Sequence, residues 1–179
     1  MSWFAQYQLQ ARYNQWFNEK IYAAAGTLTD EERKQDRGAF FKSIHRTFNH
    51  LVLTDSAWLV RFTGDQRFFP RDAKGRIIPL TGLGQELYAS FDELRSHRAR
   101  LDDEILAYTA SLTEAELLRD MEYRTSTGQP YKHPLWMALT HLFNHQTHHR
   151  GQVTALLNQF QVDVGVTDLI AFARNELPA

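Results

Sequence analysis

The chain has 179 residues, 43% of them apolar and 13% aromatic, and 20 Lys and Arg against 21 Asp and Glu give a net charge of −1. This composition excludes a disordered chain, and the balanced charge argues against nucleic acid as a partner. A chain of this length buries roughly 70% of its unfolded surface. We therefore expect one domain over residues 1–179.

Cysteine is absent, which excludes disulfides, thiolate metal sites and a cysteine nucleophile. Any thiol chemistry would therefore need a thiol from outside the chain. The N-terminal residues lack a basic segment followed by an apolar one, and nowhere do about 18 apolar residues follow one another. We expect a cytoplasmic protein that does not enter a membrane.

Four long segments carry apolar residues at helical spacing. Gly26 and Gly64 end the first two, because glycine commonly follows the last residue of a helix. The apolar stripe of the second segment is predicted to run from Phe40 to Phe62, and the third segment has Arg and Asp residues on the side opposite its stripe. The four segments cover residues 3–25, 39–63, 86–111 and the stretch from about Pro134 onward.

Shorter elements connect the four segments. Thr29 followed by Glu32 forms a capping-box pattern that predicts a short helical turn, and residues 113–118 carry a similar one. The many Pro and Gly residues between positions 64 and 84 predict a long loop, and loops of that length are often functional. A weak hairpin around Thr127 and Gly128 leads into the fourth helix, and a tail helix is expected over residues 167–174.

These elements lack βαβ alternation and any repeat at a fixed period. They predict an all-α fold, a four-helix bundle with short extra helices and a long loop between the second and third helices.

Four of the eight histidines fall in the stretch HLFNHQTHHRGQ on the fourth helix. On a helical wheel, His145 and His149 lie within or beside the apolar stripe, whereas His141 and His148 lie farther toward its edge. Side chains four residues apart are neighbours, so His145 and His149 can direct two imidazoles at one ion. The spacing alone is also compatible with surface or core histidines that bind no metal.

A third ligand would have to come from another helix. His45 and His50 flank the stripe of the second helix on opposite sides, and the wheel does not choose between them. Asp55 falls inside that stripe, and a buried carboxylate needs a partner. The partner could be the free N–H of a metal-bound imidazole, or a neighbouring Trp, Tyr or backbone group.

One familiar metal chemistry is excluded by the motif itself. The metalloprotease pattern HExxH requires a Glu beside the first histidine, and here that position is Gln146. We therefore do not expect proteolysis of the zincin type.

The chain resembles the DinB/YfiT-like family, which is unrelated to the DNA polymerase that shares the name. The segments that carry the resemblance are YNQWFN, RGAFFKSIHRTFNHLVLTDSAWL, ELRSHRARLD and HLFNHQTHHRGQV. The family motif HxxxHRGQ matches His145, His149 and the three residues after His149. The NHxxxxDxxW pattern matches His50, Asp55 and Trp58.

The resemblance implies an up-down-down-up bundle, a homodimer, and three histidines that hold a divalent metal such as nickel or zinc. Carried over by motif, the ligands fall on His50, His145 and His149, which settles the choice between His45 and His50. Some relatives are thiol S-transferases that use a low-molecular-weight thiol, one branch isomerises maleylpyruvate, and many have no assigned reaction.

Three imidazoles leave a coordination position open, and a metal ion there can activate water or an external thiol. We therefore expect a metal-dependent S-transferase or hydrolase acting on a small molecule. Asp55 is a candidate orienting residue or proton acceptor, and Arg150 or Arg61 a candidate for binding an anionic substrate group. The loop over residues 64–84, with its arginines at positions 67, 71 and 76, could cover the site.

Two alternatives come from other functional classes. The first is a non-enzymatic, stress-related metal-binding bundle in which the ion is structural. The second is a metal-free interaction module.

Overall fold

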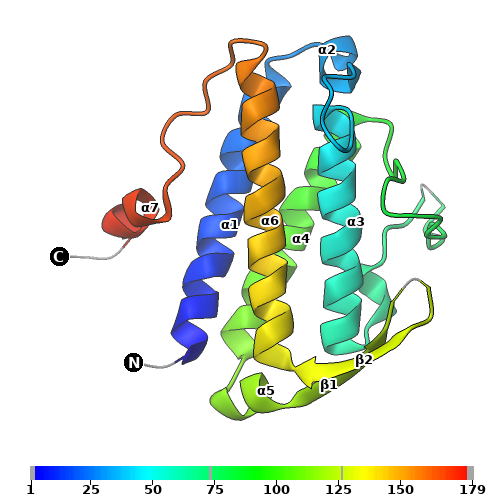
Figure 1. Ribbon diagram of the computed structural model, residues 1–179, viewed down its shortest axis with the longest axis vertical. Helices are drawn as coiled ribbons and strands as arrows, with labels where there is room; N and C mark the ends of the chain where they lie inside the picture. The colour runs from blue at the N-terminus through cyan, green and yellow to red at the C-terminus, as the bar shows by residue number, and fades with distance from the viewer. Residues whose placement is uncertain (1–2, 73, 126, 177–179) are drawn as a thin grey trace.

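The computed structural model describes residues 3–72, 74–125 and 127–176. Its frame is four long helices, which lie side by side (Figure 1). In chain order the first rises, the next two descend and the last rises, so the predicted up-down-down-up topology is confirmed. The four are α1 (Trp3–Gly26), α3 (Ile44–Thr63), α4 (Phe91–Ser111) and α6 (Leu135–Asn158).

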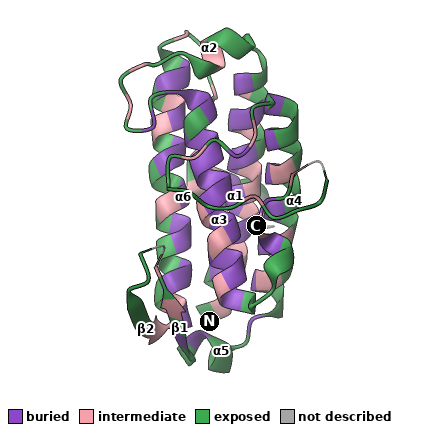
Figure 2. Cartoon of the chain, turned by 90° about the vertical axis from the view of Figure 1, so that its right-hand side faces the viewer, coloured by how far each residue is buried: buried purple, intermediate pink, exposed green. Residues whose placement is uncertain are grey.

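Each helix of this bundle contacts two others, since α1 and α3 both pack against α4 and α6. The buried positions follow the inner face of each helix, while the connecting segments and hairpin are largely exposed (Figure 2). Phe48, Leu59, Leu94 and Leu139 are completely buried at the centre. None of the described helices has the length and apolar character needed to cross a bilayer.

Hydroxyl side chains begin most of the helices, because they accept a hydrogen bond from the otherwise unpaired N–H groups of the first turn. Thr29 and Thr113 form the two predicted capping boxes, while Ser43 and Ser90 cap α3 and α4. The capped short helices are α2 (Asp30–Lys34) and α5 (Glu114–Leu118).

The start of α3 corrects the sequence prediction. The helix begins at Ile44 instead of position 39, because Lys42 has a φ of 70° and Gly38 a φ of 75°, which no helix accommodates. Phe40, expected in the apolar stripe, is 82% exposed on the turn before the helix. The third long helix likewise begins later than expected, at Phe91, after its Ser90 cap.

The connections carry the remaining elements. The long loop after α3 contains the short 3-10 helix η1 (Gln66–Phe68) and returns along the bundle to the start of α4 (Figure 1). The predicted hairpin is present as antiparallel β1 (Asp120–Arg124) and β2 (Pro130–Pro134). The tail helix α7 (Leu169–Glu176) packs its Phe172 ring against Trp16 and Tyr13 of α1.

Candidate metal centre

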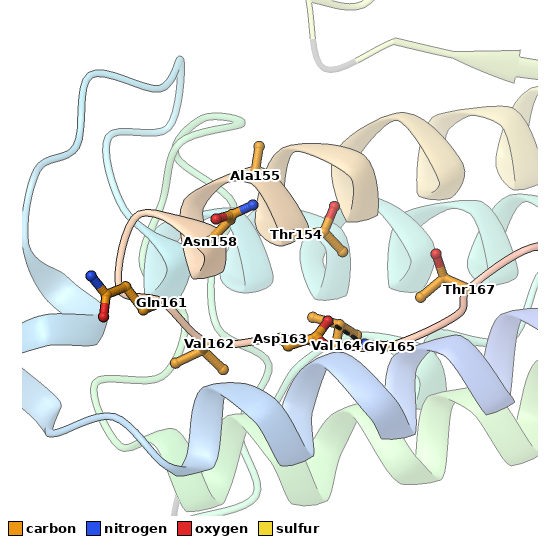
Figure 3. Close-up of a pocket in the computed structure, with 9 residues that line it drawn as sticks. All are labelled: Thr154, Ala155, Asn158, Gln161, Val162, Asp163, Val164, Gly165 and Thr167. Carbon is orange, nitrogen blue, oxygen red and sulfur yellow. Dashed lines mark hydrogen bonds between the residues drawn. The ribbon is translucent and has the colours of Figure 1, made fainter.

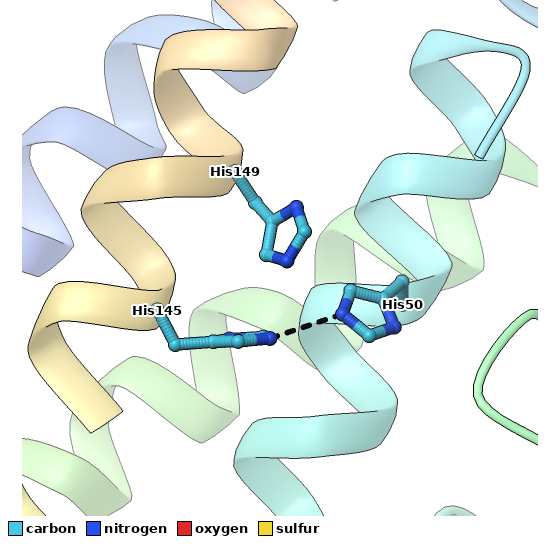
Figure 4. A group of neighbouring side chains, drawn as sticks. All are labelled: His50, His145 and His149. Carbon is cyan, nitrogen blue, oxygen red and sulfur yellow. Dashed lines mark hydrogen bonds between the residues drawn. The ribbon is translucent and has the colours of Figure 1, made fainter. Parts of the chain in front are cut away.

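Three histidines from two helices converge on one point. His50 comes from α3, and His145 and His149 come from successive turns of α6 (Figure 4). One ligand nitrogen from each ring lies within 4.8 Å of the other two. The Nε2 atoms of His50 and His145 are 3.1 Å apart. The i, i+4 spacing on α6 therefore produces the paired imidazoles that the wheel predicts.

Hydrogen bonds orient two of these rings. His50 Nδ1 is 2.8 Å from the carbonyl oxygen of Leu83, and His149 Nδ1 is 2.7 Å from Oε1 of Gln152. A carbonyl oxygen only accepts, so both Nδ1 atoms carry the proton and donate it. The lone pairs of these rings are therefore on Nε2.

The electrostatic setting keeps the rings neutral. Burial lowers the pKa of His50 to about 4 and, helped by the charges of the other histidines, lowers that of His145 to about 3. Burial also lowers the pKa of His149. A neutral imidazole has the lone pair that a metal ion needs, so at pH 7 all three rings are in the ligating form.

The donor set fits a divalent ion of the zinc type. Zinc–nitrogen bonds of about 2.0–2.1 Å in tetrahedral geometry place two donors roughly 3.3 Å apart, close to the separation of the two Nε2 atoms. His145 Nδ1 is buried and has no hydrogen-bond partner among the described residues, so no acceptor there fixes its tautomer. Three protein nitrogens also leave room for a further ligand.

Aromatic side chains bound the group on two sides. The Phe41 ring stacks on His50 with centroids 3.9 Å apart and meets His149 edge-on at 5.5 Å. On the other side His141 lies between His145, at 5.7 Å, and Trp58, at 5.3 Å. Phe41 reaches the group because the turn before α3 brings it back over the helix.

The other candidate histidines lie apart from this group or at its edge. His45 is fully buried and its Nε2 bonds to the backbone oxygen of Tyr88 at 2.8 Å, with Glu86 3.6 Å away. His141 and His148 are exposed, and His148 Nε2 lies 3.2 Å from Nε2 of Gln152. The structure therefore brings His50, and not His45, to the helix-four pair.

Asp55 is completely buried, and its partners are neither an imidazole nor the Trp, Tyr or backbone group that the sequence predicts. Its Oδ2 accepts hydrogen bonds from Arg98 Nη1 at 2.5 Å and from Gln146 Nε2 at 2.8 Å. No hydrogen bond joins it to a ring of the three-histidine group in the described part of the chain, and Asp55 reaches His149 through its charge alone. Asp55 therefore makes no hydrogen bond, among the described residues, through which it would orient an imidazole.

Asp55 belongs to a buried polar network that draws on all four long helices. Arg98 also pairs with Asp102 at 2.9 Å, and Asp102 accepts from Asn14 and Asn18 of α1. Sequence patterning placed the Arg and Asp residues of this helix opposite its apolar stripe, yet Arg98 and Asp102 are both 3% exposed. The signal for this lay in the spacing, since residues 94, 98, 101, 102 and 105 share one helix face.

The two candidate substrate arginines differ in position. Arg150 is 1% exposed, and its guanidinium donates to Asn14 and Gln146 inside the network, where a small molecule has no access. Arg61 is half-buried at the far end of α3 and lies over the rings of Trp58 and Tyr123. Of the two, only Arg61 is placed where a substrate could reach it.

The long loop reaches the site through its backbone. Its Leu83 carbonyl holds His50, whereas its arginines contact the loop itself or α4. Arg67 pairs with Asp65 and Glu104, Arg71 donates to the Gly75 carbonyl, and Arg76 pairs with Asp72. None of these contacts therefore places an arginine of the loop over the three histidines.

A sizeable cavity lies elsewhere, between the end of α6 and the segment that follows it (Figure 3). It has a volume of about 570 Å³ and is lined by polar groups that include Asn158, Asp163 and Thr167. Asp163 already accepts a hydrogen bond from the Gly165 amide. No histidine lines this cavity, so its size does not make it the reactive centre.

The fold and the site together define a class, that of up-down-down-up helical bundles with three histidines converging from two of the helices. The model of the DinB family matches residues 1–177, and the chain belongs to that family. It is 24% identical over 148 residues to Protein DinB of Bacillus subtilis, covering 82% of this chain and 81% of that protein. A crystal structure of a DinB-like protein from Bacillus cereus matches with a TM-score of 0.57 at 22% identity, over 84% of this chain and 89% of that chain, which supports the fold.

Proposed function

We propose that this DinB-family chain is a metal-dependent enzyme that holds a divalent ion, zinc or nickel, on His50, His145 and His149. The observation that carries the proposal is the convergence of three neutral imidazoles, two of them oriented by carbonyl acceptors on Nδ1. A site of this kind, with an open position, is typical of catalytic rather than structural metal centres.

The reaction we propose is attack on a small electrophilic molecule by an external thiol, or alternatively by water. A bound divalent ion would lower the pKa of such a nucleophile so that it is deprotonated near neutral pH. The chain would hold the ion through three neutral nitrogens, and the Phe41 ring, stacked on His50, would shield one side of it from solvent. Because the sequence contains no cysteine, a thiol would enter as a cosubstrate.

In this proposal Asp55 has a structural role instead of a proton-accepting one. Its contact with Gln146 joins α3 to α6 beside His145, which helps to keep the two ligand-bearing helices in register. Arg61 remains the candidate for an anionic group of the substrate. We also propose a homodimer, which the family resemblance implies, and a cytoplasmic location. Size-exclusion chromatography with light scattering would test the homodimer by measuring the mass of the protein in solution.

The test is metal analysis followed by assay. Purified protein should contain about one equivalent of divalent metal, and His50→Ala, His145→Ala or His149→Ala should each abolish stoichiometric binding. His148→Ala, an exposed histidine on the same helix, is the matched control and should keep it. Full metal content in all three ligand variants would overturn the proposal.

Metal-loaded protein should then be assayed with small electrophiles and a panel of cellular thiols. A structural ion would give neither turnover nor a thiol-dependent change in the spectrum of cobalt-substituted protein, and its removal would lower the melting temperature. A catalytic ion should give both the turnover and the spectral change.

A further inference from the structure

Beside the three histidines, a second cluster extends along the same two helices. α3 and α6 run antiparallel (Figure 1), so that His149 and His145 of α6 lie against His50 of α3, and His141, one turn farther on, lies against Trp58. The ring contacts are continuous, from His145 to His141 at 5.7 Å and from His141 to Trp58 at 5.3 Å. The row ends at Arg61.

The Arg61 guanidinium is held in place by aromatic rings. Its Cζ lies 4.7 Å from the Trp58 ring, one turn back on α3, and 5.0 Å from the Tyr123 ring of β1. Tyr123 is fixed in turn by a 3.2 Å hydrogen bond between its hydroxyl and His133 Nε2 on β2. Cation–π contacts of this kind position a guanidinium without using its N–H donors.

Those donors have no acceptor in the part of the chain that the structure describes. Within the described residues, Arg61 forms no salt bridge and donates no side-chain hydrogen bond, and it is only half-buried. Its pKa is lowered by burial, and the sole opposing influence is the Tyr123 phenol, so no carboxylate offsets its charge. This end of the row therefore favours an anion.

We infer that Arg61, with His141 as a second donor, is the anion-recognition subsite for the substrate of the three-histidine centre. The inference rests on the proposed function. The substrate class that fits is an elongated small molecule with its reactive atom at the histidines and a carboxylate or similar oxyanion at Arg61. A planar or apolar middle would lie beside Trp58.

The spacing of the two ends sets the length of that molecule. Arg61 is eleven residues beyond His50, which corresponds to roughly 16 Å along the helix axis. Side chains on a helix lean toward its N-terminus, and the long Arg61 side chain reaches back over Trp58, so the gap between its guanidinium and the His50 ring is shorter than this axial rise. A molecule about the size of a substituted aromatic acid spans this distance.

The competing explanation is that Arg61 has only a structural role, a fastener that packs the β1–β2 hairpin against α3. An arginine used purely as a fastener would make the same ring contacts but would leave ligand affinity unchanged once the fold is intact. The two explanations therefore differ in how an Arg61 variant responds to the charge of a bound ligand.

The experiment uses cobalt-substituted full-length protein and a matched pair of thiols, para-mercaptophenylacetate and its neutral methyl ester. Binding is followed by the thiolate-to-cobalt charge-transfer band. We expect wild-type protein to bind the acid about tenfold more tightly than the ester, the effect of one charge-assisted hydrogen bond. Arg61→Gln should remove this preference and leave the affinity for the ester unchanged.

Arg61→Lys keeps the charge and should retain part of the preference, while Arg95→Gln, at an exposed position on α4, should behave as wild type. Equal affinity of wild-type protein for acid and ester would overturn the subsite. So would an Arg61→Gln variant that loses affinity for both thiols as its melting temperature falls, because this is the result expected of a fastener. If wild-type protein bound no cobalt, the proposed function and this inference would both be overturned. That outcome is recognised by the absence of any cobalt spectrum, whereas a failed subsite leaves the cobalt spectrum intact.

Discussion

At the scale of single residues, the geometry of the centre depends on the hydrogen-bond acceptors that contact the Nδ1 atoms of the imidazoles. The Leu83 carbonyl and the Gln152 amide each fix one ring so that Nε2 faces the others. Such supporting acceptors raise the basicity of a ligand and hold its orientation. They determine whether three histidines that are merely close together act as one binding site.

The first prediction concerns Gln152. Gln152→Leu removes the acceptor for His149 Nδ1, so we expect metal affinity to fall by about 10–100-fold, the usual effect of losing such a support. Competition with a chromophoric chelator measures it. Gln6→Leu, an exposed substitution on α1, should leave affinity unchanged. An unaltered affinity in Gln152→Leu would show that the hydrogen bond does not orient the ring.

The sequence accounts for part of this centre. Helical spacing is sufficient to select His145 and His149, while the choice of His50 over His45 required the family motif. The Leu83 carbonyl and the Phe41 ring could not have been found, since backbone acceptors carry no residue signature and Phe41 depends on a turn that the helical pattern obscured. Arg98 was missed because a charged residue on a helix is usually exposed.

At the scale of elements, the buried network ties the four long helices together through charge. Arg98 bonds to Asp55 from α3 and pairs with Asp102 on its own helix. Burial raises the pKa of Asp102 to about 6, against the lowering effect of Arg98 and Asn18. Such a network is costly to break because each partner that remains is an unpaired buried charge.

The second prediction tests that cost. Asp55→Leu leaves Arg98 without its α3 partner, so the free energy of unfolding should fall by about 3–5 kcal/mol. The double variant Asp55→Leu with Arg98→Leu should lose less than the sum of the single variants, as measured in a urea double-mutant cycle. Additive losses would mean that the two side chains do not interact.

The third prediction separates Asp55 from the metal. Asp55→Asn keeps the shape of the side chain and removes its charge, and no histidine ring bonds to it. We expect metal stoichiometry to stay at the wild-type value although the protein is less stable. Loss of metal from a folded Asp55→Asn variant would restore the role of orienting residue considered from the sequence.

The helix boundaries show where sequence patterns stop being informative. The capping boxes at Thr29 and Thr113 were predictable, because both the donor and acceptor groups lie within four residues. The start of α3 was not, since residues 39–41 have apolar side chains that continue the helical pattern while the backbone at Lys42 is left-handed. The periodicity of apolar residues reflects side chains alone, whereas the start of α3 is determined by the backbone conformation.

At the scale of the whole molecule, buried histidines make stability depend on pH. His97 on α4 is a clean case because it lies away from the three-histidine group. Burial lowers its pKa to about 4, with the charges of Arg100 and Arg98 adding to the effect, and its Nδ1 is 3.0 Å from the Tyr88 hydroxyl. The folded protein therefore disfavours the protonated ring.

The last prediction follows from the sign of this shift. Since the ordinary pKa of histidine is about 6.5, the unfolded chain takes up the proton first as the pH falls. The contribution of His97 to stability is complete above about pH 6.5 and is lost as the pH approaches 4. In chelator-treated protein, His97→Gln, which retains an acceptor for Tyr88, should flatten the fall of unfolding free energy by up to about 1.4 kcal/mol per pH unit. Urea unfolding at several pH values between 4 and 7.5 measures the slope, and identical slopes in wild-type and variant protein would exclude His97 as a source of the pH dependence.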